Sequence, residues 1–175
     1  METKTQNLKE LYEQDFYLWV MENLKLLKNK EYGLVDWENL LEEIEDLGKG
    51  LLITVVSQTA RILEGLYKWE NFRYGPEIGY DWIETITNAR RELEDIFEDN
   101  PSLRVKAQDS ETLRWAWKAA VRALVDWFEN PKNKTLVLTY FKGKLPTEKD
   151  FPQEYPYAFQ QIIEYKPWLT QSSLD

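Results

Sequence analysis

Apolar side chains recur at the spacing of an α-helix over most of this chain. A first such stretch covers about residues 8–28, and a second begins after Asp36, which is a favourable N-cap residue. The second stretch is amphipathic at first and then apolar on nearly all sides from Leu51 onward, as in the centre of a helical bundle. Gly48 and Gly50 could bend or break this helix, and one continuous helix is the preferred interpretation.

Two further helices are predicted in the second half of the chain. A third helix covers about residues 81–98, where an aspartate followed three residues later by a glutamate forms an N-terminal capping pattern. A fourth helix has its clearest period over residues 113–128. Its start is open, because Ser102 and Asp109 are both suitable caps.

The rest of the chain is less regular. Residues 135–141 are β-branched and aromatic, which indicates a possible short extended segment. A short last helix is predicted over about residues 157–165. The aromatic and proline-rich tail over residues 155–168 either closes one end of the bundle or serves as a docking segment. The predicted fold is therefore all-α, a bundle of four main helices plus a short C-terminal helix, in a single domain over residues 1–175.

Composition narrows the chemistry. The sequence has 31 acidic and 22 basic residues, a net charge of −9, no histidine and no cysteine. The missing histidine removes the usual general base and the commonest metal ligand, and the missing cysteine removes thiolate chemistry. The negative charge argues against nucleic acid and anionic membranes as partners. No cofactor is predicted. With neither a signal-peptide pattern nor a long apolar run, we expect a cytoplasmic protein that does not enter membranes.

Several segments together resemble a known family. They are residues 12–19, 36–48, Lys68-Trp69, 82–86 with Arg90, 101–103 and 151–157, of which the stretch from Asp36 to Gly48 is the most specific. These segments are similar to the bacterial domain-of-unknown-function family DUF29, and they indicate a member of the type found in cyanobacteria. The resemblance covers nearly the whole chain and implies an all-helical fold without an assigned activity. Gly65 stands where family members often have histidine, Tyr155 where they often have cysteine, and the segment 132–149 is longer than usual.

Two charged residues fall on apolar helix faces, Asp15 on the first helix and Arg90 on the third. Because removing a charge from water costs several kcal/mol, Arg90 needs a partner there. We predict an ion pair between Arg90 and Asp15, Glu42, Glu43 or Glu45. Asp15, Glu43 and Arg90 together form a candidate buried polar site, which is either a structural ion pair or a functional pocket.

A second candidate is a metal site on acidic helix faces. Glu42 and Glu45, with Glu92 and Asp95 downstream, fit the paired acidic motifs with which all-α nucleotide pyrophosphohydrolases hold Mg²⁺ or Mn²⁺. The separation between the two pairs is longer than in those enzymes. With 31 acidic residues such matches also arise by chance, so a solvated helix face is the favoured interpretation.

A basic stripe of Arg114, Lys118 and Arg122 lies on the fourth helix, opposite its apolar stripe. It is either solvated or meets an acidic partner surface, such as that of a second copy. The function favoured by the sequence is that of a non-enzymatic protein-interaction module, which binds another protein or itself as a homo-oligomer. The alternative is a divalent-metal-dependent nucleotide hydrolase that uses the acidic helix face.

Overall fold

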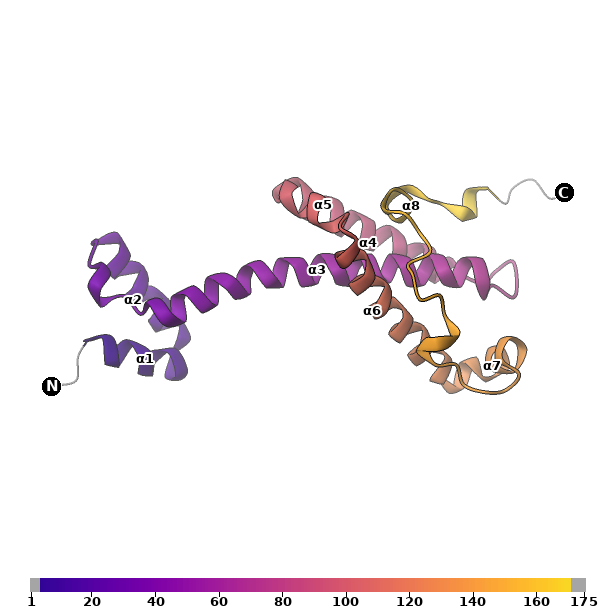
Figure 1. Cartoon of the computed structure of the whole chain (residues 1–175), viewed down its shortest axis with the longest axis horizontal. Helices are drawn as coiled ribbons and strands as arrows, with labels where there is room; N and C mark the ends of the chain where they lie inside the picture. Colours follow the sequence, from indigo (N-terminus) through magenta and orange to yellow (C-terminus); the bar gives the residue numbers. More distant parts are fainter. Residues whose placement is uncertain (1–3, 171–175) are drawn as a thin grey trace. The chain divides into compact units, whose positions relative to one another are not determined.

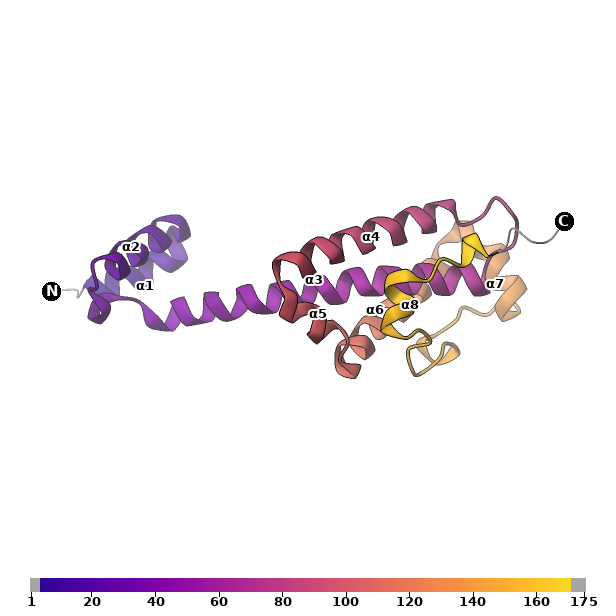
Figure 2. The same cartoon turned by 90° about the horizontal axis from the view of Figure 1, so that it is seen from above.

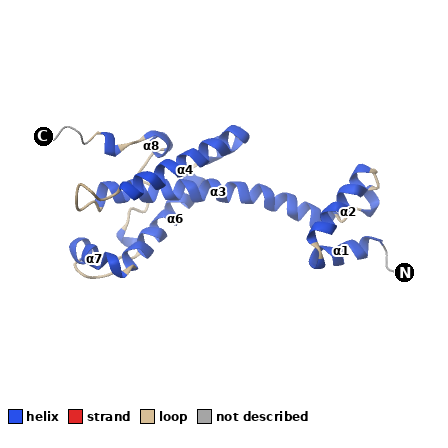
Figure 3. Ribbon diagram, turned by 180° about the vertical axis from the view of Figure 1, so that it is seen from behind, coloured by secondary structure: helices blue, strands red, loops and turns tan. Residues whose placement is uncertain are grey.

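The computed structural model of the chain describes residues 4–170, with side chains from residue 7 onward. All regular structure in this range is helical, which confirms the all-α prediction (Figure 3). The chain divides into two compact units, residues 1–51 and residues 52–175. The prediction of one domain stays a prediction. No helix in the described range combines the length and the apolar character that crossing a membrane requires.

The N-terminal unit contains α1 (Lys4–Gln14), α2 (Phe16–Lys28), a 3₁₀ turn (Tyr32–Leu34) and the start of α3 (Trp37–Asn71). The prediction of one helix over residues 8–28 was wrong at Asp15, which has φ −150° and caps α2. Its Oδ1 accepts a hydrogen bond from the Leu18 N–H at 3.0 Å. An aspartate that bonds the backbone in this way favours a helix start over a helix interior.

Helix α3 runs without interruption from Trp37 to Asn71, so the preference for a continuous helix is confirmed. Gly48 and Gly50 both lie within it, and neither has a positive φ. The first turns of α3 belong to the N-terminal unit and the remainder to the C-terminal unit. The two glycines therefore weaken the helix by their low propensity but do not break it.

The C-terminal unit packs α4 (Tyr80–Asp99) and α6 (Ser110–Glu129) against the second part of α3. Figures 1 and 2 show α4 side by side with this part of α3 in both views. The contact is close, because a Cβ added to Gly65 would lie 2.7 Å from Cγ1 of Ile86. The largest fully buried apolar side chains of this core are Ile62, Leu63, Leu66, Ile86, Leu93, Leu124, Phe128 and Ile162.

Three predicted elements of this unit differ in the structure. The predicted fourth helix is two helices, α5 (Pro101–Ala107) and α6, so Ser102 and Asp109 both lie near real helix starts. The segment near 135–141 is not extended but helical, as α7 (Lys134–Phe141). Leu136 and Val137 are buried in the core there, and this packing overrides the β-propensity of the segment. The last helix is shorter than predicted, α8 (Phe159–Glu164).

Candidate interaction surface

Arg90 binds helix carbonyls instead of the predicted carboxylate. Its Nε donates to the Ile162 carbonyl at 2.8 Å, and its Nη2 donates to the carbonyls of Tyr165 at 2.8 Å and Gln161 at 3.1 Å. These groups form the C-terminal end of α8, where unpaired carbonyls carry partial negative charge. Burial lowers the pKa of Arg90 to about 10, opposed by the nearby carboxylate of Glu164. Arg90 thus holds α8 against α4.

The two carboxylates grouped with Arg90 in the prediction bond within the N-terminal unit. Asp15 is exposed and caps α2. Glu43 accepts a hydrogen bond from the Tyr12 hydroxyl at 2.6 Å. This hydrogen bond, together with burial, raises the pKa of Tyr12 to about 12. Both carboxylates therefore have local structural roles.

The four acidic residues of the predicted metal site are all exposed. Glu42 and Glu45 lie on the first turns of α3, and Glu92 and Asp95 lie on α4. Glu45 pairs with Lys49, whose Nζ is 2.9 Å from its Oε1. Over residues 4–170 no group of three or more acidic side chains is close enough together to hold a metal ion. The acidic pair on α3 and the acidic pair on α4 each supply only two carboxylates, which is fewer than the three of such a group.

The basic stripe lies exposed along α6. Arg122 Nε is 3.4 Å from Oε1 of Glu148, and Arg114 donates to the Ser110 hydroxyl at 3.2 Å. Lys118 lies between them, beside a shallow depression that Arg114 and Glu148 also line. These contacts are local and exposed, so each contributes little to stability. A partner for this stripe stays a prediction.

The predicted tail closes the C-terminal unit around Glu70. The hydroxyls of Tyr157 and Tyr165 both donate to this carboxylate, at 2.5 and 2.7 Å. Tyr157 is buried, and burial together with this hydrogen bond raises its pKa. Of the two interpretations of the tail, the structure supports closure of the bundle.

The most unusual surface of the molecule is on the N-terminal unit, where large apolar side chains of α2 and α3 are exposed. Soluble monomers expose single apolar residues often, but seldom a contiguous set. Sequence periodicity missed this surface, because several of these residues belong to stripes that had been assigned to the core. The exposed residues are Phe16, Tyr17, Leu18, Val20, Met21 and Leu24 on α2, and Trp37, Leu41, Ile44, Leu47 and Leu51 on α3.

A groove of about 380 Å³ runs between α2 and α3 within this surface. Its walls are almost entirely apolar. The exposed residues of the α3 wall are Ile44, at 57% of its surface, and Leu47, at 71%. On the α2 side the groove is lined by Phe16, Val20 and Leu24. An open apolar groove between two helices is the geometry that receives a further helix.

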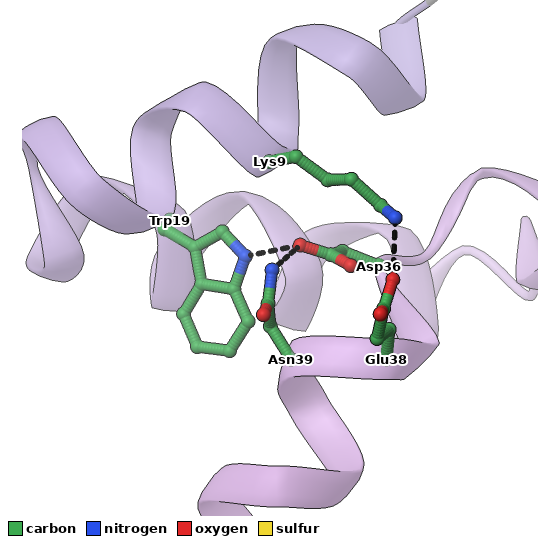
Figure 4. A network of polar contacts seen from close by, with 5 residues as sticks. All are labelled: Lys9, Trp19, Asp36, Glu38 and Asn39. Atoms are coloured by element: carbon green, nitrogen blue, oxygen red, sulfur yellow. Dashed lines mark hydrogen bonds and ion pairs between the residues drawn. The ribbon is translucent and has the colours of Figure 1, made fainter.

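A buried polar network lies beside the groove and joins its two walls (Figure 4). Asp36 is 1% exposed, and its Oδ2 accepts hydrogen bonds from Trp19 Nε1 at 3.1 Å and Asn39 Nδ2 at 2.7 Å. The Asp36 N–H donates to Asn23 Oδ1 at 3.0 Å, and Asn23 Nδ2 donates to the Trp19 carbonyl at 2.9 Å. Asp36 Oδ1 is buried without a hydrogen-bond partner among the described residues, whereas the other bonds of the network join α2 to the start of α3 and favour one arrangement of these elements.

Helix α1 adds further contacts to this arrangement. Lys9 Nζ pairs with Oε2 of Glu38 at 2.5 Å, as Figure 4 shows. The Trp19 ring packs in a triangle with two aromatic neighbours, with ring centroids 5.0 Å from Tyr12 and 5.4 Å from Phe16. Aromatic pairs at these distances stabilise beyond the area that they bury. The groove walls are thus held by contacts that leave the apolar rim uncovered.

Comparison with known proteins places the chain in a family. A family model described as domain of unknown function DUF29 matches residues 11–168. No curated protein and no solved structure is significantly similar to the chain. The matched range includes residues of both units. That the chain is of the type found in cyanobacteria stays a prediction. The all-helical fold, the resemblance of the segment from Asp36 to Gly48 and the match over residues 11–168 agree, and the chain belongs to the DUF29 family.

Proposed function

We propose that this protein is a non-enzymatic protein-interaction module and that the apolar groove of its N-terminal unit is the binding surface. The observation that carries the proposal is the exposure of large apolar side chains along both walls, with Leu47 at 71% and Ile44 at 57%. Exposed apolar surface of this kind on a folded unit marks an interaction site. Its burial by a partner is the main favourable contribution to association.

The groove also suits binding because its walls are already in place. Trp19 and Asp36 are each 1% exposed and hydrogen-bonded to each other across the two helices. A partner therefore meets a surface that needs little ordering, which reduces the entropy cost of association. The same walls offer almost no polar group that could take part in a reaction, which supports recognition over catalysis.

The hydrolase alternative needs acidic side chains that converge on one metal. In the part of the chain that the structure describes, three or more such side chains do not gather at any one place. One of the four candidates, Glu45, is already paired with Lys49. The apolar groove therefore supports the interaction module better than the acidic motifs support the hydrolase.

A photo-crosslinking amino acid placed at Leu47 tests the proposed function. Benzoylphenylalanine replaces Leu47 in the full chain, which is expressed in its native host and irradiated. The control carries the same amino acid at Val105, which is 67% exposed on α5 and distant in sequence from the groove. We expect a crosslinked adduct at position 47 and none at position 105. If neither position gives an adduct, or if both give the same ones, the groove is not a protein-binding surface.

A further inference from the structure

We infer that the partner that fills the groove is a second copy of this chain, with α3 of each copy lying in the groove of the other. This inference rests on the proposed function and adds the identity of the partner. Four features of the N-terminal unit support it: the spacing of the apolar residues on α3, the area of the exposed face, the residues on the outer flank of α3, and the distribution of charge around the face.

The apolar residues of α3 follow the spacing of a two-helix seam. Trp37, Leu40, Ile44, Leu47 and Leu51 are separated by three, four, three and four residues. This heptad spacing keeps one helix face against a second helix with the same repeat. Ile44, Leu47 and Leu51 are 57%, 71% and 43% exposed, so α1 and α2 of the same unit leave the seam uncovered. A second copy supplies a helix with the matching repeat.

The exposed area is sufficient for a stable dimer. Six residues along the groove and the seam are between 38% and 71% exposed: Phe16, Val20, Leu24, Ile44, Leu47 and Leu51. Their exposed surface equals that of about three fully exposed large side chains, or roughly 500 Å². Two copies would therefore bury about 1,000 Å² of apolar surface. Homodimer interfaces are about 65% apolar, so the whole interface would measure about 1,500 Å², a standard size.

The side of the seam that faces away from α2 also fits a close second copy. Successive residues of an α-helix are rotated by about 100° around its axis. Around α3, Leu41 and Gly48 therefore lie next to the seam on this side, and Glu45 lies beyond them. Leu41 is 60% exposed, and a Cβ added to Gly48 would meet no atom within 4 Å. No contact within the chain therefore requires glycine at position 48, although glycine weakens a helix interior. Close approach by α2 of the second copy would cover the exposed Leu41 and would give a reason for glycine at position 48.

Charge is complementary in this arrangement. Lys28 lies at the end of α2, on the outer edge of the groove, and has no ion-pair partner within residues 4–170. With α3 of each copy in the groove of the other, α2 lies beside the outer flank of the partner's α3. Lys28 of one copy then faces Glu45 of the other, which remains largely exposed beside its local partner Lys49. The net charge of −9 opposes association at long range, but at physiological salt it is screened beyond about 8 Å.

Sedimentation equilibrium of the purified full chain, from low micromolar to several hundred micromolar, tests the inference. We expect a reversible dimer whose dissociation constant rises at least about tenfold in Leu47→Glu, because a charge then lies at the centre of the interface. Val105→Glu is the matched control and should leave the dimer unchanged, because Val105 is similarly exposed. Circular dichroism verifies that both variants fold.

A charge exchange gives a second, more specific test. Lys28→Glu and Glu45→Lys should each weaken the homodimer by about two- to fivefold, as expected for exposed ion pairs. A mixture of the two variants should recover wild-type affinity, because each α2 then faces an α3 flank of opposite charge. Weakening in the single variants without recovery in the mixture would overturn the arrangement.

The outcomes separate this inference from the proposed function. A chain that stays monomeric at all concentrations, yet crosslinks through position 47 to a protein of different mass, overturns the dimer and leaves the interaction module standing. A monomer without any adduct at position 47 overturns both. A dimer that Leu47→Glu does not weaken uses another surface, and it also overturns the inference.

Discussion

Replacement of Gly65 by alanine isolates a close contact between α3 and α4 in the C-terminal unit. The added Cβ would lie 2.7 Å from Cγ1 and 2.9 Å from Cδ1 of Ile86, well inside normal contact distance. Ile86 is fully buried and β-branched, so it cannot turn away without displacing its neighbours. Overpacking of this kind costs about 1–3 kcal/mol, and the better helix propensity of alanine offsets about 1 kcal/mol. We expect a net loss of up to about 2 kcal/mol in the free energy of unfolding.

Gly48→Ala is the matched control, because it lies in the same helix and its added Cβ meets nothing within 4 Å. It should raise stability by up to about 1 kcal/mol through helix propensity alone. Urea denaturation at low micromolar protein, followed by far-ultraviolet circular dichroism, measures both variants. A Gly65→Ala protein as stable as Gly48→Ala would refute the reasoning.

A double-mutant cycle identifies the contact itself. Ile86→Ala alone should cost about 2–5 kcal/mol, because it leaves a cavity in a closed core. In the Gly65→Ala background the new methyl group occupies part of that cavity, and the clash is gone. The double variant should therefore lose at least about 1 kcal/mol less than the sum of the single variants. If the losses of the two single variants simply add in the double variant, positions 65 and 86 are not energetically coupled, and the contact does not explain the loss in Gly65→Ala.

Three further predictions concern charge. Arg90→Met should lower the stability of the C-terminal unit by about 2–3 kcal/mol and the hydrogen-exchange protection of α8, because the carbonyls of Ile162 and Tyr165 lose their donor, whereas the exposed neighbour Arg91→Met should change neither. The pKa of Tyr157 is raised from the usual 10.0, so the folded state keeps this proton more tightly than the unfolded state. The contribution of Tyr157 to stability should therefore be constant below pH 10 and fall as the pH rises further, and the fall should be smaller in Tyr157→Phe, as measured by thermal melting. Titration with Mn²⁺ by calorimetry should give no saturable heat. Micromolar binding that is lost in both Glu42→Gln and Glu45→Gln would instead support the hydrolase alternative.

Much of the helical fold could be predicted, because long apolar periods dominate α3, α4 and α6. The two errors, at Asp15 and in α7, have different causes. Asp15 lies at an apolar-face position by periodicity, but its carboxylate bonds the Leu18 N–H and starts a new helix. In α7, the β-branched residues favour a strand by local propensity, but the burial of Leu136 and Val137 in the core stabilises a helix instead. Hydrophobic periodicity does not report side-chain hydrogen bonds to the backbone. It also does not report packing against residues that are distant in the sequence.

The candidate surface could not be predicted for a different reason. An apolar stripe at helical spacing has the same pattern whether its own chain or a partner covers it. The stripe through Ile44 and Leu47 has this pattern, and the exposure of both residues shows that α1 and α2 do not cover it. The partner of Arg90 was equally hidden, because backbone carbonyls more than seventy residues away carry no sequence signature. Gly65 was noted as a departure from the family pattern, and its contact with Ile86 gives this departure a physical reason.

The polar network and the apolar groove of the N-terminal unit are best understood together. Side chains such as Leu47, which remain exposed, contribute little to the stability of the unit that carries them. A unit of this size has little apolar surface to spare, so other contacts must fix its helices. Trp19, Asn23 and Asp36 supply them, and all three are 1% exposed. A purely apolar seam between α2 and α3 would stabilise the unit by closing the groove. Hydrogen bonds beside the groove fix the two walls relative to each other while Ile44 and Leu47 stay exposed, and under the proposed function this exposed surface is the one that a partner buries.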